Sequence, residues 1–157
     1  MSVDFLYELM NKNKQDELLL PLAILYKEYD IIKTLINDPL TNTSYCYNNL
    51  PTHCAVQYGH LDILKMLLEK YPCTDDLLDS ATYEITKYLL EERLVDPNNS
   101  RAFFFATQNN NLDIVELLLE YNLTEYSVNF GLFTAKKWKH NNIVKVIENY
   151  LEKIKYL

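Results

Sequence analysis

The feature that most constrains the fold of this 157-residue chain is a pattern that recurs along it. An alanine is followed, eight residues later, by an isoleucine that begins a run of aliphatic residues at helical spacing. The four full copies pair Ala23 with Ile31, Ala55 with Ile63, Ala106 with Ile114, and Ala135 with Ile143. A shortened copy, from Leu77 to Ile85, lies between the second and the third of these. Regular internal repetition is typical of a repeat protein.

Each copy is predicted to form a helix, a tight turn and a second helix. In the second copy, Ile63, Leu64 and Leu67 lie on one face of the second helix, with Asp62 placed to stabilise its positive start. Gly59 permits the turn between the two helices. A single pair cannot bury its apolar face, so neighbouring pairs must stack. The sequence therefore predicts an all-α helix-turn-helix solenoid of about five stacked repeats with helical caps.

The copies also set the predicted boundaries of the repeats. We expect one domain over residues 1–157, made of an N-terminal cap helix at 1–14 and repeats at 15–40, 41–73, 74–97, 98–126 and 127–157. The third repeat is several residues short, so its first helix should be clipped or tilted. The cap helix should use Phe5, Leu6, Leu9 and Met10 as its apolar side. The last helix should present a polar outer side with Lys145, Glu148, Glu152 and Lys153.

One copy carries a specific family resemblance. The stretch from Leu50 to Glu69 resembles the ankyrin repeat through Pro51, His53, Ala55, Gly59, His60, Leu61, Ile63, Lys65, Leu67 and Leu68. The other copies match mainly through the alanine and the second helix, and together they cover roughly residues 15–157. The resemblance implies a structural role for His53. It also implies connecting fingers near Asp96-Pro97 and Asp38-Pro39, and a concave binding surface formed by the fingers and the first helices.

Composition limits the kinds of partner. The net charge is −7, whereas a nucleic-acid-binding protein needs clustered Lys and Arg. The densest basic run, from Lys136 to His140, is interpreted as a solvated helix end. No segment approaches the roughly 20 apolar residues of a membrane span, and the N-terminus does not resemble a secretory signal. We expect a cytoplasmic monomer that binds neither nucleic acid nor membranes.

The cysteines and histidines do not indicate a catalytic or metal centre. The three cysteines, Cys46, Cys54 and Cys73, have irregular spacing that fits reduced thiols better than disulfides. Cys46, His53 and Cys54 lack the spacing of zinc ligands. Adjacent side chains on a helix diverge, so His53 and Cys54 are not a nucleophile and its base. We therefore expect no enzymatic activity, no metal and no cofactor.

Thirteen tyrosines and one tryptophan draw attention to a binding surface, because exposed aromatic residues favour protein recognition. Compositional bias is an equally good explanation for any single tyrosine, since Asn, Lys and Ile are abundant too. Some tyrosines, such as Tyr29, are predicted to be core residues, whereas Tyr45, Tyr47 and Tyr126 fall in predicted fingers. Aligning the alanines gives this set of candidate partner-binding residues: Tyr45, Tyr47, Asn49, Gln57, Tyr58, Arg101, Gln108, Asn109, Tyr126, Asn129, Lys137 and Trp138.

The predicted function is a non-enzymatic protein–protein interaction module that binds a partner protein on its concave face. The degenerate, Asn- and Tyr-rich repeats resemble those of large DNA viruses or AT-rich microbes. Viral members of the ankyrin repeat family often redirect host signalling or protein degradation. This resemblance implies a modulator of host proteins that acts in the host cytoplasm. Two alternatives stay open: an enzyme or metal-dependent protein on the same scaffold, and a self-assembling structural protein.

Overall fold

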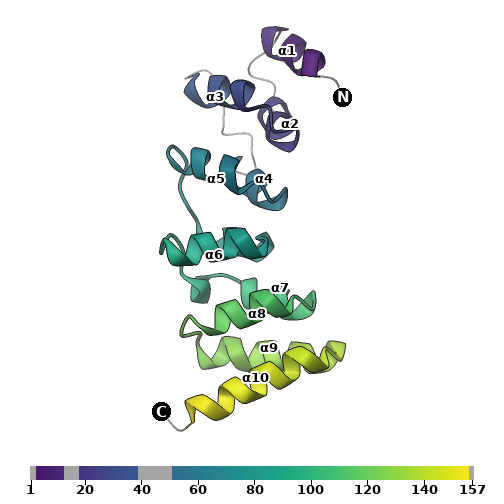
Figure 1. Cartoon of the computed structure of the whole chain (residues 1–157), viewed down its shortest axis with the longest axis vertical. Helices are drawn as coiled ribbons and strands as arrows, with labels where there is room; N and C mark the ends of the chain where they lie inside the picture. Colours follow the sequence, from purple (N-terminus) through teal and green to yellow (C-terminus); the bar gives the residue numbers. More distant parts are fainter. Residues whose placement is uncertain (1–2, 13–17, 39–50, 156–157) are drawn as a thin grey trace. The chain divides into compact units, whose positions relative to one another are not determined.

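A computed structural model describes residues 3–12, 18–38 and 51–155 of the chain (Figure 1). Every regular element within these ranges is a helix, which confirms the predicted all-α repeat fold. The chain divides into two compact units, Met1–Cys73 and Thr74–Leu157. The division falls at the predicted boundary between the second and third repeats.

The first unit contains the N-terminal helix and two helical pairs. Its elements are α1 (Val3–Lys12), α2 (Leu19–Leu25), α3 (Tyr29–Asn37), α4 (Pro51–Gln57) and α5 (Leu61–Leu68). Helix α1 packs on α2, α2 packs on α3 and α4, and α4 packs on α5. Helix α1 thus covers the first repeat through the buried Leu6. The prediction was wrong for Phe5, which is exposed.

The second unit begins with the shortened repeat. Its elements are η2 (Asp75–Ser80), α6 (Tyr83–Glu91), η3 (Pro97–Asn99), α7 (Ala102–Gln108), α8 (Leu112–Leu119), α9 (Glu125–Trp138) and α10 (Asn141–Ile154). A 3₁₀ helix of six residues, η2, stands where the other repeats have a first α-helix. The prediction of a clipped first helix is therefore confirmed. Helix α7 packs on η2, α8 and α9, and α10 packs on both α8 and α9.

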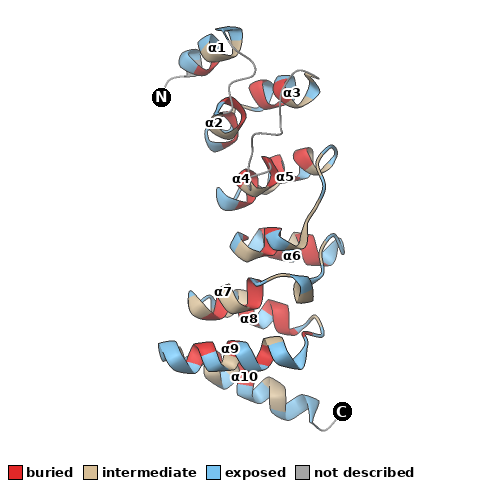
Figure 2. Ribbon diagram, turned by 180° about the vertical axis from the view of Figure 1, so that it is seen from behind, coloured by how far each residue is buried: buried red, intermediate tan, exposed pale blue. Residues whose placement is uncertain are grey.

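The core follows the repeat register in both units (Figure 2). The four alanines that define the repeats are buried, because a small side chain lets the helices approach closely. The leading isoleucines Ile31, Ile63, Ile85 and Ile143 have no exposed surface. Ile114 is only half-buried, and the next residue, Val115, takes the core position in its place.

The turn between the two helices adopts the same backbone conformation in all four full repeats. Four residues after the alanine, the chain adopts a positive φ, at Lys27 (58°), Gly59 (72°), Asn110 (59°) and Lys139 (61°). The next residue then donates its backbone N–H to the alanine carbonyl over 2.8–2.9 Å in all four turns. This left-handed closure satisfies a carbonyl at the helix end. Only one of the four turns uses glycine, the residue that adopts this conformation without steric cost.

Replacing Lys139 with glycine is expected to stabilise the chain by about 0.5–1 kcal/mol. A left-handed conformation costs a residue with a Cβ about 1–2 kcal/mol, and the greater backbone entropy of unfolded glycine offsets part of that gain. Urea denaturation followed by circular dichroism measures the change. The matched control is Lys145→Gly inside α10, which should instead destabilise by about 1 kcal/mol. Equal losses in both variants would contradict the proposed role of the turn.

Candidate protein-binding face

The structure leaves most of the predicted binding residues accessible. Gln57 and Tyr58 in the first unit are exposed, at the end of α4 and directly after it. The exposed candidates in the second unit are Arg101, Asn109, Tyr126, Asn129, Lys137 and Trp138, whereas Gln108 is half-buried. Tyr45, Tyr47 and Asn49 lie outside the described residues.

The predicted position of Tyr126 in a finger was wrong. Helix α9 begins at Glu125, so Tyr126 lies in its first turn. The helix starts there because Thr124 caps it: its hydroxyl accepts a hydrogen bond from the backbone N–H of Ser127 at 3.3 Å. The early start places Tyr126 on the same helix as Phe130, one turn apart.

Aromatic rings on α7 and α9 form a continuous layer on the surface of the second unit. Tyr126 and Phe130 are parallel, with an interplanar angle of 3° and ring centroids 6.1 Å apart. Phe130 stacks on Phe104 at 5.3 Å, and Phe104 contacts Phe105 at 5.2 Å. The guanidinium carbon of Arg101 lies 5.1 Å from the centre of the Phe105 ring. We call Arg101, Phe104, Phe105, Tyr126 and Phe130 the aromatic strip.

Arg101 is held in place at one end of the strip by the shortened repeat. Asp79, at the end of η2, accepts the backbone N–H of Arg101 at 2.7 Å and its Nε–H at 3.1 Å. The Arg101 side chain nevertheless stays largely exposed. A guanidinium fixed by a carboxylate and an aromatic ring loses little conformational entropy when a partner binds. The orientation of the Arg101 side chain is therefore fixed by Asp79 and Phe105.

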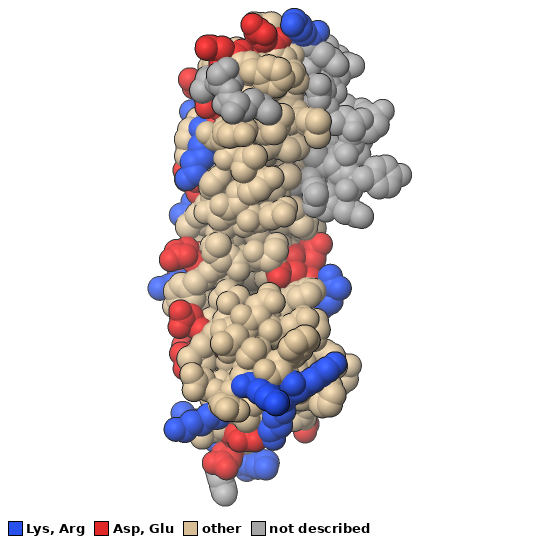
Figure 3. Space-filling view, turned by 90° about the vertical axis from the view of Figure 1, so that its right-hand side faces the viewer, with Lys and Arg blue, Asp and Glu red and all other residues tan. Residues whose placement is uncertain are grey.

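The exposed surface of α9 continues beyond the strip. Phe133 is 63% exposed and Trp138 is 53% exposed. Lysines gather at this end of the helix: Lys136 pairs with Glu148 of α10 at 2.7 Å, while Lys137 and Lys139 are exposed. Figure 3 shows a largely uncharged face in the region of α7 and α9, with Lys and Arg side chains over its lower part. This is an aromatic surface with a basic margin.

Four phenylalanines of this surface, at positions 104, 105, 130 and 133, were missed from the sequence. The register contained a signal for two of them. Phe130 and Phe133 precede Ala135 by five and two residues, as Arg101 and Phe104 precede Ala106. The exposure of Arg101, at the first of these offsets, therefore indicates the exposure of Phe130.

In the first unit, polar side chains tie the first repeat to the second. The prediction that Tyr29 is a core residue was wrong, because its ring is exposed and its hydroxyl donates a hydrogen bond to the Asp62 carboxylate. This bond lowers the pKa of Asp62 and raises the pKa of Tyr29. Lys70 Nζ donates to the Ile36 carbonyl at 2.9 Å and to Asn37 Oδ1 at 2.6 Å. These contacts join α3 to the start of α5 and to the residues that follow it.

Within 3–12, 18–38 and 51–155, no three His, Cys, Asp or Glu side chains converge closely enough to hold a metal ion. Among the helices of those ranges, none has the length and apolar character needed to cross a bilayer. Cys54 is buried and forms no disulfide with any described residue.

Comparison with known proteins points to one family. A family model described as "Ankyrin repeats (3 copies)" matches residues 2–77, slightly less than half of the chain. Residues 2–77 are therefore similar to ankyrin repeats. Ankyrin repeats generally mediate protein–protein interaction and are typically not enzymes.

Two relatives support this assignment. The chain is 26% identical to an ankyrin repeat protein of Rickettsia bellii over 138 residues, which are 85% of this chain and 17% of the relative. It is 27% identical to an ankyrin repeat protein of Acanthamoeba polyphaga mimivirus over 121 residues, which are 64% of this chain and 36% of the relative. The chain thus spans much less than two thirds of the length of either relative. No solved structure matches the chain.

Proposed function

We propose that this chain is a non-enzymatic interaction module, and that its partner protein docks on the exposed side of the first helices with the aromatic strip at the centre. The observation that carries this proposal is the continuous layer of rings from Tyr126 to Arg101 on α7 and α9. In a soluble protein, contiguous exposed apolar surface marks an interaction site. Aromatic residues and arginine are also the types that dominate binding energy at interfaces.

The arrangement of the strip suits it to an anchoring role. Tyr126 is 77% exposed, so most of its ring is available for burial by a partner. Stacking on neighbouring rings fixes the orientation of Phe130 and Phe104, which reduces the entropy lost on binding. The same face contains Asn109, Asn129 and Lys137, which form a polar and basic margin in this proposal, and Trp138 is a further exposed aromatic side chain on α9. In the first unit, Gln57 and Tyr58 occupy the corresponding end of a first helix.

Phe130→Ala and Trp138→Ala are each expected to weaken binding of the partner at least about tenfold, because both remove an exposed aromatic side chain from α9. Crosslinking in a cell extract and mass spectrometry identify the partner, and isothermal titration calorimetry measures affinity. The matched controls are Ile154→Ala in the last turn of α10 and Glu69→Ala after α5, both exposed and outside α7 and α9 in the sequence. If the controls abolish binding and the aromatic variants do not, the partner uses another surface.

The proposal includes a host protein as partner and the host cytoplasm as the place of action. It is supported by the sources of the two relatives, a Rickettsia and a virus of Acanthamoeba. Capture of the same partner with equal efficiency by the intact chain and by the Phe130→Ala variant would remove the structural basis for this proposal. The chain is proposed to act as a monomer, which light scattering tests directly.

A further inference from the structure

The shortened third repeat leaves a groove inside the second unit. Its leading isoleucine, Ile85, follows Ile63 by only 22 residues, so the chain has too few residues for a complete first helix. The six-residue η2 takes that position and ends at Ser80, and residues 81 and 82 lead directly into α6. The connection between η2 and α6 lies opposite the α7–α8 turn, and a hollow remains between the two.

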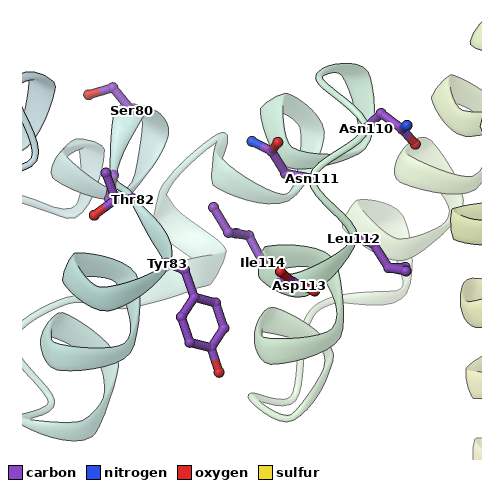
Figure 4. A pocket seen from close by; sticks show the side chains of 9 residues that line it. Ser80, Thr82, Tyr83, Asn110, Asn111, Leu112, Asp113 and Ile114 are labelled. Atoms are coloured by element: carbon purple, nitrogen blue, oxygen red, sulfur yellow. The ribbon is translucent and has the colours of Figure 1, made fainter.

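The groove consists of two adjoining hollows. The first has a volume of about 590 Å³ and lies between residues 80–83 on one side and residues 110–114 on the other. Figure 4 shows Thr82 and Tyr83 on the η2–α6 side and Asn111, Asp113 and Ile114 on the opposite side. The second, of about 580 Å³, shares Tyr83 and Asp113 with the first and continues between α6 and α8 as far as Glu120. The two form an open channel rather than a closed cavity.

The lining of the first hollow suits an extended peptide. Ser80 and Thr82 have hydroxyls and Asn111 has an amide, groups that pair with both N–H and C=O of a main chain. Ala81 and Ile114 provide an apolar floor between them. Asn110 owes its place in the turn to a left-handed φ of 59°, a conformation that asparagine tolerates better than most residues.

The charged side chains that line the second hollow are mainly negative. Asp113, Glu116 and Glu120 follow one another along the exposed side of α8. None of the three forms an ion pair with any residue in the described ranges, whereas Lys87 across the groove pairs with Glu91 at 3.7 Å. The three carboxylates are spread over two helical turns and, like the rest of the described chain, do not converge on a metal-ion site. Their charge fits cations distributed along a ligand.

We propose that the groove binds an extended basic segment of the partner protein, with its main chain against residues 80–82 and 110–111 and its Lys or Arg side chains against Asp113, Glu116 and Glu120. This inference rests on the proposed function, because it names a second contact region for the same partner. The aromatic strip is apolar with a basic margin, so it does not compete for a basic segment. Charge complementarity therefore assigns different parts of the partner to the two surfaces.

The test uses the full chain labelled with ¹⁵N and a defined probe. The probe is a degenerate nonapeptide library with arginine fixed at the third, fifth and seventh positions, and the matched library has glutamate fixed there. We expect the arginine library to shift the amide resonances of Tyr83 and residues 110–114, and the glutamate library to leave them unchanged. The double variant Glu116→Gln, Glu120→Gln should weaken this binding about tenfold at low salt. The control variant Glu84→Gln, Glu152→Gln loses the same charge outside the groove and should retain binding.

Three results would overturn the inference. One is the absence of groove shifts with the arginine library, and another is equal weakening by the groove and control variants, which would show unspecific attraction to an acidic protein. The third is self-association of the chain that Glu116→Gln, Glu120→Gln abolishes, because the occupant would then be a second copy. The proposed function fails separately: loss of the groove result leaves the Phe130 and Trp138 experiment unaffected, since that experiment probes α9 alone.

Discussion

Replacing Leu67 with alanine lowers the free energy of unfolding by about 2–5 kcal/mol, the range measured for fully buried leucines. Leu67 has no exposed surface and lies on the inward side of α5, opposite the exposed Lys65 and Glu69. Its removal takes apolar area out of the core and leaves a cavity between helices that already contact one another closely. Guanidinium denaturation followed by circular dichroism measures the loss.

A matched control separates core packing from a general effect of losing a leucine. Leu18, in the same unit, is 65% exposed and precedes α2. Leu18→Ala removes the same atoms from a solvated position and should change the free energy of unfolding by less than about 0.5 kcal/mol. Similar losses in both variants would mean that the inward side of α5 has been assigned incorrectly.

The second helices and the turns could be predicted from the sequence because their determinants are local. Apolar residues at every third or fourth position lie on one side of a helix, and that side is the one that is buried. Ile63, Leu64 and Leu67 are all fully buried, as expected. The alanine register also placed the four turns correctly. It did not reveal that Lys27 and Lys139 adopt the left-handed backbone conformation, because those residues seldom do so.

The errors arose where residue type was used in place of geometry. Tyr29 was assigned to the core because it stands at the position of Leu61, but its hydroxyl requires a polar partner and finds Asp62 on the next repeat. Tyr126 was assigned to a finger because repeat boundaries are weakly marked, and the Thr124 cap begins α9 earlier. A contact with the next repeat decided the position of Tyr29, which a single sequence does not show, whereas the local cap at Thr124 decided the position of Tyr126.

The candidate site was predicted in part. Aligning the alanines of the repeats correctly predicted that Arg101, Asn109 and Trp138 are exposed. The phenylalanines of the aromatic strip were missed because a run of three, Phe103 to Phe105, resembles core sequence. In the structure the run is divided: Phe103 is buried, and the next two rings are half-buried within the strip. The reason for that division lies on the neighbouring helix, at Gly131.

Gly131 marks the closest approach between α9 and α7. A Cβ atom at this position would lie 2.4 Å from Cε1 and 2.7 Å from Cδ1 of the Phe103 ring, far inside normal contact. It would also lie 3.3 Å from Cγ2 of Thr107. The Phe103 ring is buried, so it has little room to move away. Glycine in the middle of a helix is unfavourable by about 1 kcal/mol relative to alanine, and the packing of Phe103 accounts for its presence.

Gly131→Val is therefore expected to destabilise the chain by about 2–3 kcal/mol, because it overfills a closely packed contact between two first helices. Gly131→Ala is the more discriminating variant. Helix propensity alone predicts that it stabilises by about 1 kcal/mol, whereas the clash with Phe103 predicts a net loss. Urea denaturation of both variants gives the sign. Asn129→Ala, at an exposed position of the same helix, is the control and should be neutral or slightly stabilising.

A second substitution tests whether Phe103 is the cause of that loss. Phe103→Leu shortens the side chain that the new Cβ meets, so the combination with Gly131→Ala should lose less stability than the sum of the two single changes. Simple additivity would show that Gly131 is retained for some reason other than the Phe103 ring.

Because Phe103 directly precedes the two rings of α7 in the aromatic strip, both variants are also expected to change partner binding. Gly131→Ala should perturb partner binding even though residue 131 is itself buried, and Phe103→Leu should restore part of the affinity.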